Sequence, residues 1–138
     1  MAVSYKPQLN YTDFKDLTEQ IHFQSSEGKI WFGEQRMLLM NLTSLGAFRR
    51  EIVNSMGAER AKGFFLRQGY LSGLKDAELA RKLRPHCSEL DIFLAGPQLH
   101  SLKGMVKVIP LEIDLDQETG DFYGRLEWID SWEVEICK

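Results

Sequence analysis

The feature that most constrains the fold is a change in hydrophobic period near Met105. Between residues 43 and 104, apolar side chains recur with the three-to-four spacing of amphipathic helices. Beyond it they alternate with period two, which is typical of strands with one buried face. Helices followed by adjacent strands favour an α+β architecture. We therefore predict an α+β fold with a helical middle and a C-terminal antiparallel β-hairpin.

The helical middle is predicted to begin with two consecutive helices. Thr43 is the expected N-cap of the first, which ends at Gly57. The second covers residues 58–83 and contains internal glycines. Glycine weakens a helix interior. The glycines therefore indicate either a close approach by a neighbouring backbone or a break near Gly69 or Gly73.

A third helix is predicted to begin at Ser88, with Asp91 three residues later in a capping-box-like arrangement. It extends to about Ala95 or beyond, where a Gly-Pro pair at 96–97 marks a break. His100 follows this break in an otherwise apolar sequence. A lone histidine in such a place is either a structural residue with satisfied hydrogen bonds or part of a binding site.

The N-terminal part, residues 1–42, is predicted to form a short helix and a hairpin arm. The helix covers residues 12–21 and starts at a capping Thr12. Turns are expected at 26–28 and 32–34, with short strands between them. Several apolar residues on this arm would then need a partner surface: Ile30, Trp31, Met37 and Leu39.

The C-terminal part is predicted to be a hairpin whose loop lies at residues 116–120. The switch of alternation at Pro110 indicates a bulge or bend. One face of the first strand would carry Val106 and Val108, and the other Leu111, Ile113 and Leu115. The returning strand would place Phe122, Gly124, Leu126 and Trp128 on one face. The last residues, SWEVEICK, continue a strand-like alternation, which we interpret as a cut through a longer chain.

Composition narrows the class of protein. A chain of 138 residues with 43% hydrophobic and 27% charged residues is predicted to be one soluble globular unit. A net charge of −3 argues against direct nucleic-acid binding. The sequence contains no membrane-length apolar run and no signal peptide, so we predict a cytoplasmic location. Cys87 and Cys137 are interpreted as reduced thiols, too few for a zinc site.

Two side chains stand out as candidates for binding. His100 offers a hydrogen-bond acceptor, and Trp128 offers an indole N–H donor that needs a partner when buried. In a pocket with otherwise apolar walls, this pair would suit a small aromatic ligand that carries a hydroxyl group. The alternative for Trp128 is an ordinary core aromatic residue.

Catalysis finds little support in the sequence. Asp114 and Asp116 lie beside a loop, and Glu133 and Glu135 share one face of the predicted last strand, so a solvated surface explains both pairs. No nucleophile has a recognisable spacing to His100. Phosphate-binding loops and the H-E-x-x-H zinc motif are absent. We predict no catalytic residue and no metal site.

Four long strings make the sequence resemble a known family: FQSSEGKIWFGEQRMLLM, ERAKGFFLRQGYLSGLKDAELARKLRP, FLAGPQLHSLKGMVKV and FYGRLEWIDSWEVEIC. They are similar to the N-terminal sensory domains of the XylR/DmpR/MopR/PoxR-type bacterial activators, with the phenol-responsive branch as the expected placement. The similarity runs from about Tyr5 to the last residue.

The resemblance implies a function. Such a domain binds an aromatic effector and, when empty, restrains an AAA+ ATPase domain that drives alternative-sigma-factor transcription. A separate helix-turn-helix domain binds the DNA. The N-terminal segment, residues 1–42, would contribute to a homodimer, and residues 43–138 would form the first part of the sensory domain.

The resemblance also implies site residues. His100 and Trp128 match the pair that holds a phenolic hydroxyl. Four apolar wall positions match less closely: Phe93, Val108, Phe122 and Leu126. Glu135 matches a position linked to effector specificity. The family's cysteine-bound zinc and further pocket walls are expected beyond residue 138, and no ATPase or DNA-binding motif occurs in this chain.

Two other functions remain open on the sequence alone. A small isomerase or hydratase with His100 as general base would need a second catalytic group. An interaction module in which residues 21–42 dimerise would need no ligand at all.

Overall fold

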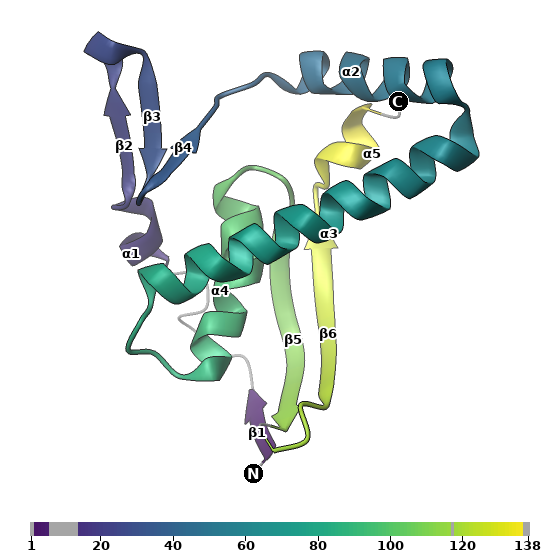
Figure 1. The fold of residues 1–138 in the computed structure, drawn as a ribbon. Helices are drawn as coiled ribbons and strands as arrows, with labels where there is room; N and C mark the ends of the chain where they lie inside the picture. The colour runs from purple at the N-terminus through teal and green to yellow at the C-terminus, as the bar shows by residue number, and fades with distance from the viewer. Residues whose placement is uncertain (1, 6–13, 117, 137–138) are drawn as a thin grey trace.

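The structure is a computed structural model that describes residues 2–5, 14–116 and 118–136. It confirms the α+β class, with three long helices in the middle of the chain and antiparallel strands before and after them (Figure 1). Helix α4 (Glu89–Leu102) packs against both α3 (Ala58–Leu83) and strand β5 (Lys107–Asp116). This central position of α4 places its side chains between the helical and the β part.

The N-terminal arm consists of α1 (Lys15–Thr18) and a three-stranded antiparallel sheet, β2 (Ile21–Gln24), β3 (Lys29–Phe32) and β4 (Gln35–Met37). The predicted helix over 12–21 is too long, because β2 begins at Ile21 to pair with β3. The expected cap, Thr12, lies outside the described residues. Both predicted turns are present, and each contains a glycine in the left-handed region, Gly28 (φ 63°) and Gly33 (φ 55°).

The arm packs onto the rest of the chain. Leu17 and Phe32 are buried in one core cluster with Leu79, Ala80, Ala95 and Leu99. Met37 packs partly against this cluster, and Ile30 and Trp31 are half-buried. Leu39, by contrast, is 85% exposed. Much of the apolar surface predicted to need a partner therefore finds it within the same chain.

Helix α3 has the predicted boundaries, and α2 (Leu42–Met56) ends as predicted but begins two residues earlier than a Thr43 cap implies. The expected Thr43 cap is wrong: Asn41 is the N-cap, and its side chain accepts a hydrogen bond from the Ser44 N–H at 2.7 Å. Helix α3 is continuous through its glycines. A Cβ added at Gly69 or Gly73 would meet no atom within 4 Å, so neither of the predicted reasons for these glycines holds there.

Helix α4 begins as predicted, with the Ser88 side chain accepting from the Asp91 N–H at 3.1 Å. The predicted break at Gly96-Pro97 is wrong, since the helix continues to Leu102. Pro97 cannot donate to the carbonyl of Phe93, four residues earlier, which removes one helical hydrogen bond. Helix α4 nevertheless stays continuous, in contact with α3 on one side and with β5 on the other.

Strands β1 (Ala2–Tyr5), β5 and β6 (Phe122–Ile129) form a second antiparallel sheet in the order β1-β5-β6. Strand β1 was not predicted. The predicted irregularity at Pro110 is confirmed as a register shift between Pro110 and Glu112. The extra residue at this shift puts Ile113 and Leu115 on the same face of the sheet as Val108. The expectation that Ile113 and Leu115 lie opposite Val108 is therefore wrong.

The residues after β6 form a short helix, α5 (Trp132–Ile136), where strand-like alternation was predicted. Asp130 adopts φ 55° and ends the strand, and the Trp132 N–H donates to the Met105 carbonyl at 3.0 Å. Glu133 and Glu135 therefore do not share a strand face. Glu133 instead pairs with Arg49 of α2 at 3.1 Å.

Across residues 2–5, 14–116 and 118–136, no helix combines the length and the apolar character needed to cross a membrane.

Candidate functional site

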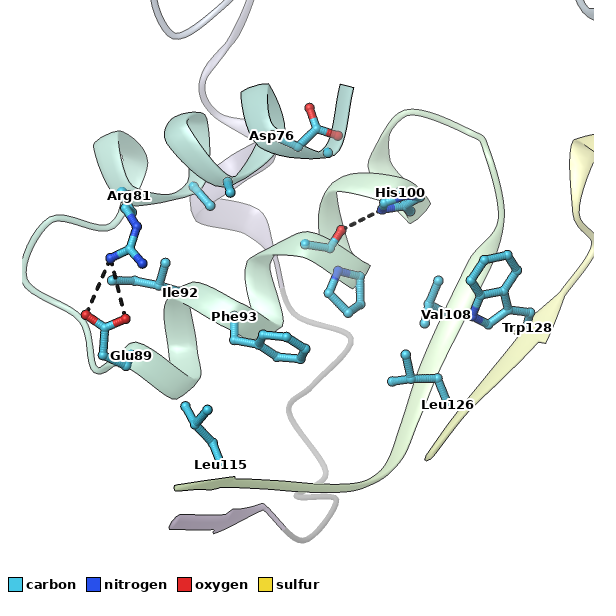
Figure 2. A pocket seen from close by; sticks show the side chains of 15 residues that line it. Asp76, Arg81, Glu89, Ile92, Phe93, His100, Val108, Leu115, Leu126 and Trp128 are labelled. Atoms are coloured by element: carbon cyan, nitrogen blue, oxygen red, sulfur yellow. Dashed lines mark hydrogen bonds and ion pairs between the residues drawn. The ribbon is translucent and has the colours of Figure 1, made fainter. Parts of the chain in front are cut away.

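A cavity of about 480 Å³ lies between the C-terminal half of α3, helix α4 and the inner face of the β5–β6 hairpin (Figure 2). Small-molecule sites have volumes of this order and mostly apolar walls. The wall here is apolar over most of its area, and its large apolar residues are Ile92, Phe93, Pro97, Val108, Leu115, Leu126 and Trp128.

His100 lies on α4 and lines this cavity. Its Nδ1 atom is 2.9 Å from the Gly96 carbonyl oxygen, one helical turn earlier. A carbonyl oxygen only accepts, so Nδ1 carries the proton in this hydrogen bond. In the neutral ring, Nε2 then keeps its lone pair. The helix backbone thus selects the tautomer in which His100 presents an acceptor.

Trp128 reaches the same cavity from β6. Its strand partner is Val108, and the hydroxyl of Ser101 on α4 accepts from the Val108 N–H at 3.2 Å. This link sets the hairpin against the helix that carries His100. Trp128 is 61% exposed, so the cavity is open at this end. Within the described part of the chain, the indole N–H of Trp128 makes no hydrogen bond.

Phe93 and Phe122 form a tilted aromatic pair beside the cavity, with ring centroids 4.6 Å apart. Phe93 lines the cavity directly, and Phe122 packs against Phe93. Gly124 makes room for this arrangement, since a Cβ there would lie 2.6 Å from Cζ of Phe122.

Two ion pairs lie at the rim. Asp76 of α3 lines the cavity and pairs with Lys103 at the end of α4. Arg81 and Glu89 also line it and pair at 3.4 Å. The first pair is mostly buried and the second is exposed. Charge at the rim is therefore compensated within each pair.

The structure brings most of the predicted site residues together. His100, Trp128, Phe93, Val108 and Leu126 line one cavity, and Phe122 supports it from behind. Glu135 does not line it, because it lies exposed on α5.

Several wall residues escaped the sequence analysis. Leu115 was assigned to the wrong face, since the bulge after Pro110 was not counted in the alternation. Asp76, Arg81, Glu89 and Ile92 were missed. Their helical spacing placed them on α3 and α4, but which helix faces meet the hairpin is a property of the tertiary packing.

Apart from His100, the described residues considered for metal or catalytic roles do not line this cavity. Asp116 accepts from the backbone N–H groups of Glu118 (2.9 Å) and Thr119 (3.4 Å), which is the role of a turn residue. Cys87 is an exposed free thiol, and Cys137 lies outside the described residues. No three metal-ligating side chains group together in the described ranges.

An apolar, half-open cavity lined by one imidazole and one indole has the make-up that is typical of small-molecule sites. Comparison with known families then identifies the chain: it belongs to the family of activators of aromatic catabolism, the XylR N-terminal family, whose model matches residues 16–116.

Comparison with individual proteins gives relatives of the same kind. The chain is 59% identical over 138 residues to the transcriptional regulatory protein XylR of Pseudomonas putida, a match that covers all of this chain and 24% of XylR. It is 44% identical over 124 residues to the phenol regulator MopR of Acinetobacter guillouiae, covering 90% of this chain and 22% of MopR. The chain thus spans about a quarter of the length of these curated relatives.

A solved structure is also similar. The phenol-responsive sensory domain of the transcription activator PoxR, crystallised with phenol, superposes with a TM-score of 0.85 at 39% identity. The match covers 94% of this chain and 65% of that domain.

Proposed function

We propose that this chain is the effector-sensing part of a bacterial transcriptional activator, and that it binds phenol or a related small aromatic in the cavity between α3, α4 and the β5–β6 hairpin. One observation carries the proposal: an acceptor on His100 and an unused donor on Trp128 border the same apolar cavity. The family membership and the phenol complex of the similar PoxR domain support it.

The hydroxyl group gives the proposed selectivity. Phenol ionises near the pKa of tyrosine, about 10, so at neutral pH it binds as a neutral molecule. Its O–H donates to Nε2 of His100, and its oxygen accepts from the Trp128 N–H. Phe93, Val108 and Leu126 contact the ring. Benzene offers neither hydrogen bond, so phenols are preferred.

The size of the ligand limits the affinity. Phenol has seven heavy atoms, and the ceiling of about −1.5 kcal/mol per atom limits binding to roughly −10 kcal/mol. A micromolar dissociation constant, about −8 kcal/mol, fits within that limit.

The remaining roles concern the complete regulator. Effector binding relieves the restraint that the empty domain places on an AAA+ ATPase domain of the same protein. Residues 1–42 contribute to a homodimer, and the protein works in the cytoplasm without direct contact between this domain and nucleic acid. No step is assigned to zinc. Signalling requires that the effector prefer one arrangement of the domain over another, because equal affinity shifts nothing.

Glu135 is proposed to affect effector specificity indirectly. It lies on α5, which follows β6 and packs against α2. Trp128 lies on β6, only four residues before α5 begins. A change at Glu135 would act on the cavity by shifting α5 and the end of β6.

The experiment that tests the proposal is calorimetric titration of the full chain with phenol, for the wild type and His100→Ala. Losing the partner of a buried polar group costs about 1–3 kcal/mol, so we expect affinity to fall roughly 5- to 150-fold. His22→Ala is the matched control, since His22 lies exposed on the arm. Unchanged phenol affinity in His100→Ala would remove the basis of the proposal.

A second function, a dimerisation module without a ligand, is favoured by one observation. Leu38 and Leu39, just after β4, are 81% and 85% exposed. The two functions differ in their response to phenol, because a ligand that binds the folded state raises its melting temperature. A melting temperature that does not respond to phenol, together with dimerisation, would favour the module. An isomerase or hydratase is the weaker alternative, and turnover of aromatic substrates would reveal it.

A further inference from the structure

Ser101 holds the end of α4 against the start of β5 through its side chain. Its hydroxyl oxygen accepts from the Val108 N–H at 3.2 Å, and its hydroxyl hydrogen can reach the carbonyl oxygens of Val106 (3.2 Å) and Pro97 (3.3 Å). Val106 and Val108 are buried, so their backbone groups need partners within the protein. In the described ranges, β1 pairs only with the opposite end of β5. The Ser101 hydroxyl therefore takes the place of a neighbouring strand at this end of β5.

The turn that follows α4 fixes His100 and Ser101 together. Gly104 adopts φ 71°, and its N–H donates to the Ser101 carbonyl at 3.1 Å, while the Met105 N–H donates to the His100 carbonyl at 3.0 Å. These two hydrogen bonds form a Schellman motif, in which a left-handed glycine closes the helix. The backbones of His100 and Ser101 therefore belong to one closed helix end, and the Ser101 hydroxyl links this end to β5.

Val108 in turn sets the position of Trp128, its partner in the β5–β6 ladder. Because the Val108 N–H points to Ser101 on α4, it points away from β6, and Val108 and Trp128 form a non-hydrogen-bonded pair. Side chains in such pairs lie closer together than those in hydrogen-bonded pairs. Figure 2 shows Val108 and Trp128 side by side on the hairpin, with His100 on the neighbouring helix. One hydroxyl contact and one cross-strand pair therefore connect the His100 end of α4 to Trp128.

We infer that Ser101 is a positioning residue for the effector, which fixes the spacing between the acceptor of His100 and the donor of Trp128. This inference rests on the proposed function of the cavity. A hydrogen bond weakens when its donor and acceptor are more than about 3.2 Å apart. One phenolic oxygen can therefore bind both side chains only if Nε2 of His100 and Nε1 of Trp128 are held within about 6 Å of each other. Without the Ser101 bridge, α4 and the hairpin can shift apart, and the oxygen then keeps only one of its two hydrogen bonds.

Calorimetric titration of the full chain with phenol and with toluene tests this role. The two ligands have the same number of heavy atoms, but only phenol can form the two hydrogen bonds. Ser101→Ala should lower phenol affinity roughly 2- to 12-fold, the range for one neutral hydrogen bond, and toluene affinity less than about twofold. Ser72→Ala is the matched control, because it removes an exposed helical hydroxyl that accepts from Gln68 at 2.9 Å. This control should leave both affinities unchanged.

A double-mutant cycle with Trp128→Phe separates positioning from a general loss of stability. The spacing matters only while both hydrogen bonds can form. In the Trp128→Phe background, Ser101→Ala should therefore change phenol affinity less than about twofold. An equal loss in both backgrounds would show that Ser101 acts on the fold in general, and it would overturn the inference. If toluene binds too weakly to measure, this cycle alone decides. If Ser101→Ala does not fold, Ser101→Cys provides the same test, since its larger sulfur is a weak hydrogen-bond acceptor.

The remaining outcomes distinguish this inference from the proposed function. If Ser101→Ala leaves phenol affinity unchanged while binding still depends on His100, the positioning role is wrong and the proposed function stands. Equal losses for phenol and toluene would also contradict the positioning role, because toluene forms no hydrogen bond. A wild type that does not bind phenol would overturn both.

Discussion

The two flanks of α4 differ in how completely they are filled. On the flank toward α3 and the arm, Ala95 and Leu99 are fully buried against Leu17, Phe32 and Leu79. On the flank toward the hairpin, Phe93 and His100 remain half-buried and border a cavity. The filled flank stabilises the fold, and the unfilled flank leaves room for a ligand. One helix thus performs both tasks because its partners differ.

The largest effect on stability should follow from a substitution that removes a buried side chain from the filled flank. Leu99→Ala removes a fully buried side chain and leaves a space that the surrounding helices cannot close. Such changes cost about 2–5 kcal/mol of unfolding free energy. Leu126→Ala, on the cavity side, removes the same atoms from a half-buried position and should cost roughly 1 kcal/mol or less.

Urea unfolding of the two variants checks this contrast. The difference in unfolding free energy should exceed about 1 kcal/mol, with Leu99→Ala the less stable protein. Equal losses would mean that the hairpin side is packed as tightly as the core, and the comparison between the flanks would then fail.

A smaller effect should follow from removing one hydrogen bond on the cavity flank. Trp128→Phe keeps an aromatic ring but loses the N–H donor. A neutral hydrogen bond contributes about 0.5–1.5 kcal/mol, so phenol affinity should fall roughly 2- to 12-fold without a comparable loss of stability. Trp31→Phe serves as the control, since its indole donates to Gln24 on the arm at 3.2 Å. Calorimetric titration with phenol distinguishes the two variants, and equal affinities would count against a role for the Trp128 donor.

The filled flank was largely predictable from sequence, because local rules govern it. The Ser88 cap, the turns at Gly28 and Gly33 and the helical stripes of α2 and α3 each depend on neighbours within a few residues. These patterns were sufficient to predict the class of fold, the end of α2, both ends of α3 and the start of α4.

The unfilled flank was less predictable because it depends on distant contacts. Alternation misplaced Leu115, since a single extra residue in β5 reverses every side chain that follows it. The Gly-Pro pair at 96–97 predicted a break, but tertiary packing keeps α4 continuous. Asp76 and Lys103 are 27 residues apart, so only the folded chain brings their charges together. His100 and Trp128 were singled out because an imidazole and an indole stand out in apolar sequence, and both line the cavity.

The smallest predicted effect concerns how the arm is attached to the filled flank. Arg84 donates to both carboxylate oxygens of Asp16, at 2.9 and 3.1 Å, and also to the Asp91 carbonyl at 3.2 Å. The hydrogen bonds and charge of Arg84 lower the pKa of Asp16 below its ordinary value of 3.8. A carboxylate whose folded-state pKa is lowered stabilises the protein above its unfolded pKa, and the contribution disappears as pH falls through the folded value.

Acid titration of stability tests this attachment. Because the Asp16 side chain is 55% exposed, solvent screening limits the contribution to about 1 kcal/mol or less. The wild type should therefore exceed Asp16→Asn in unfolding free energy by up to that amount at pH 6, and the two should converge as pH falls below 3.8. A difference that stays constant down to low pH would show that the Asp16 charge does not hold the arm. The attachment of the arm would then rest mainly on its apolar packing, with Leu17 and Phe32 in the core cluster.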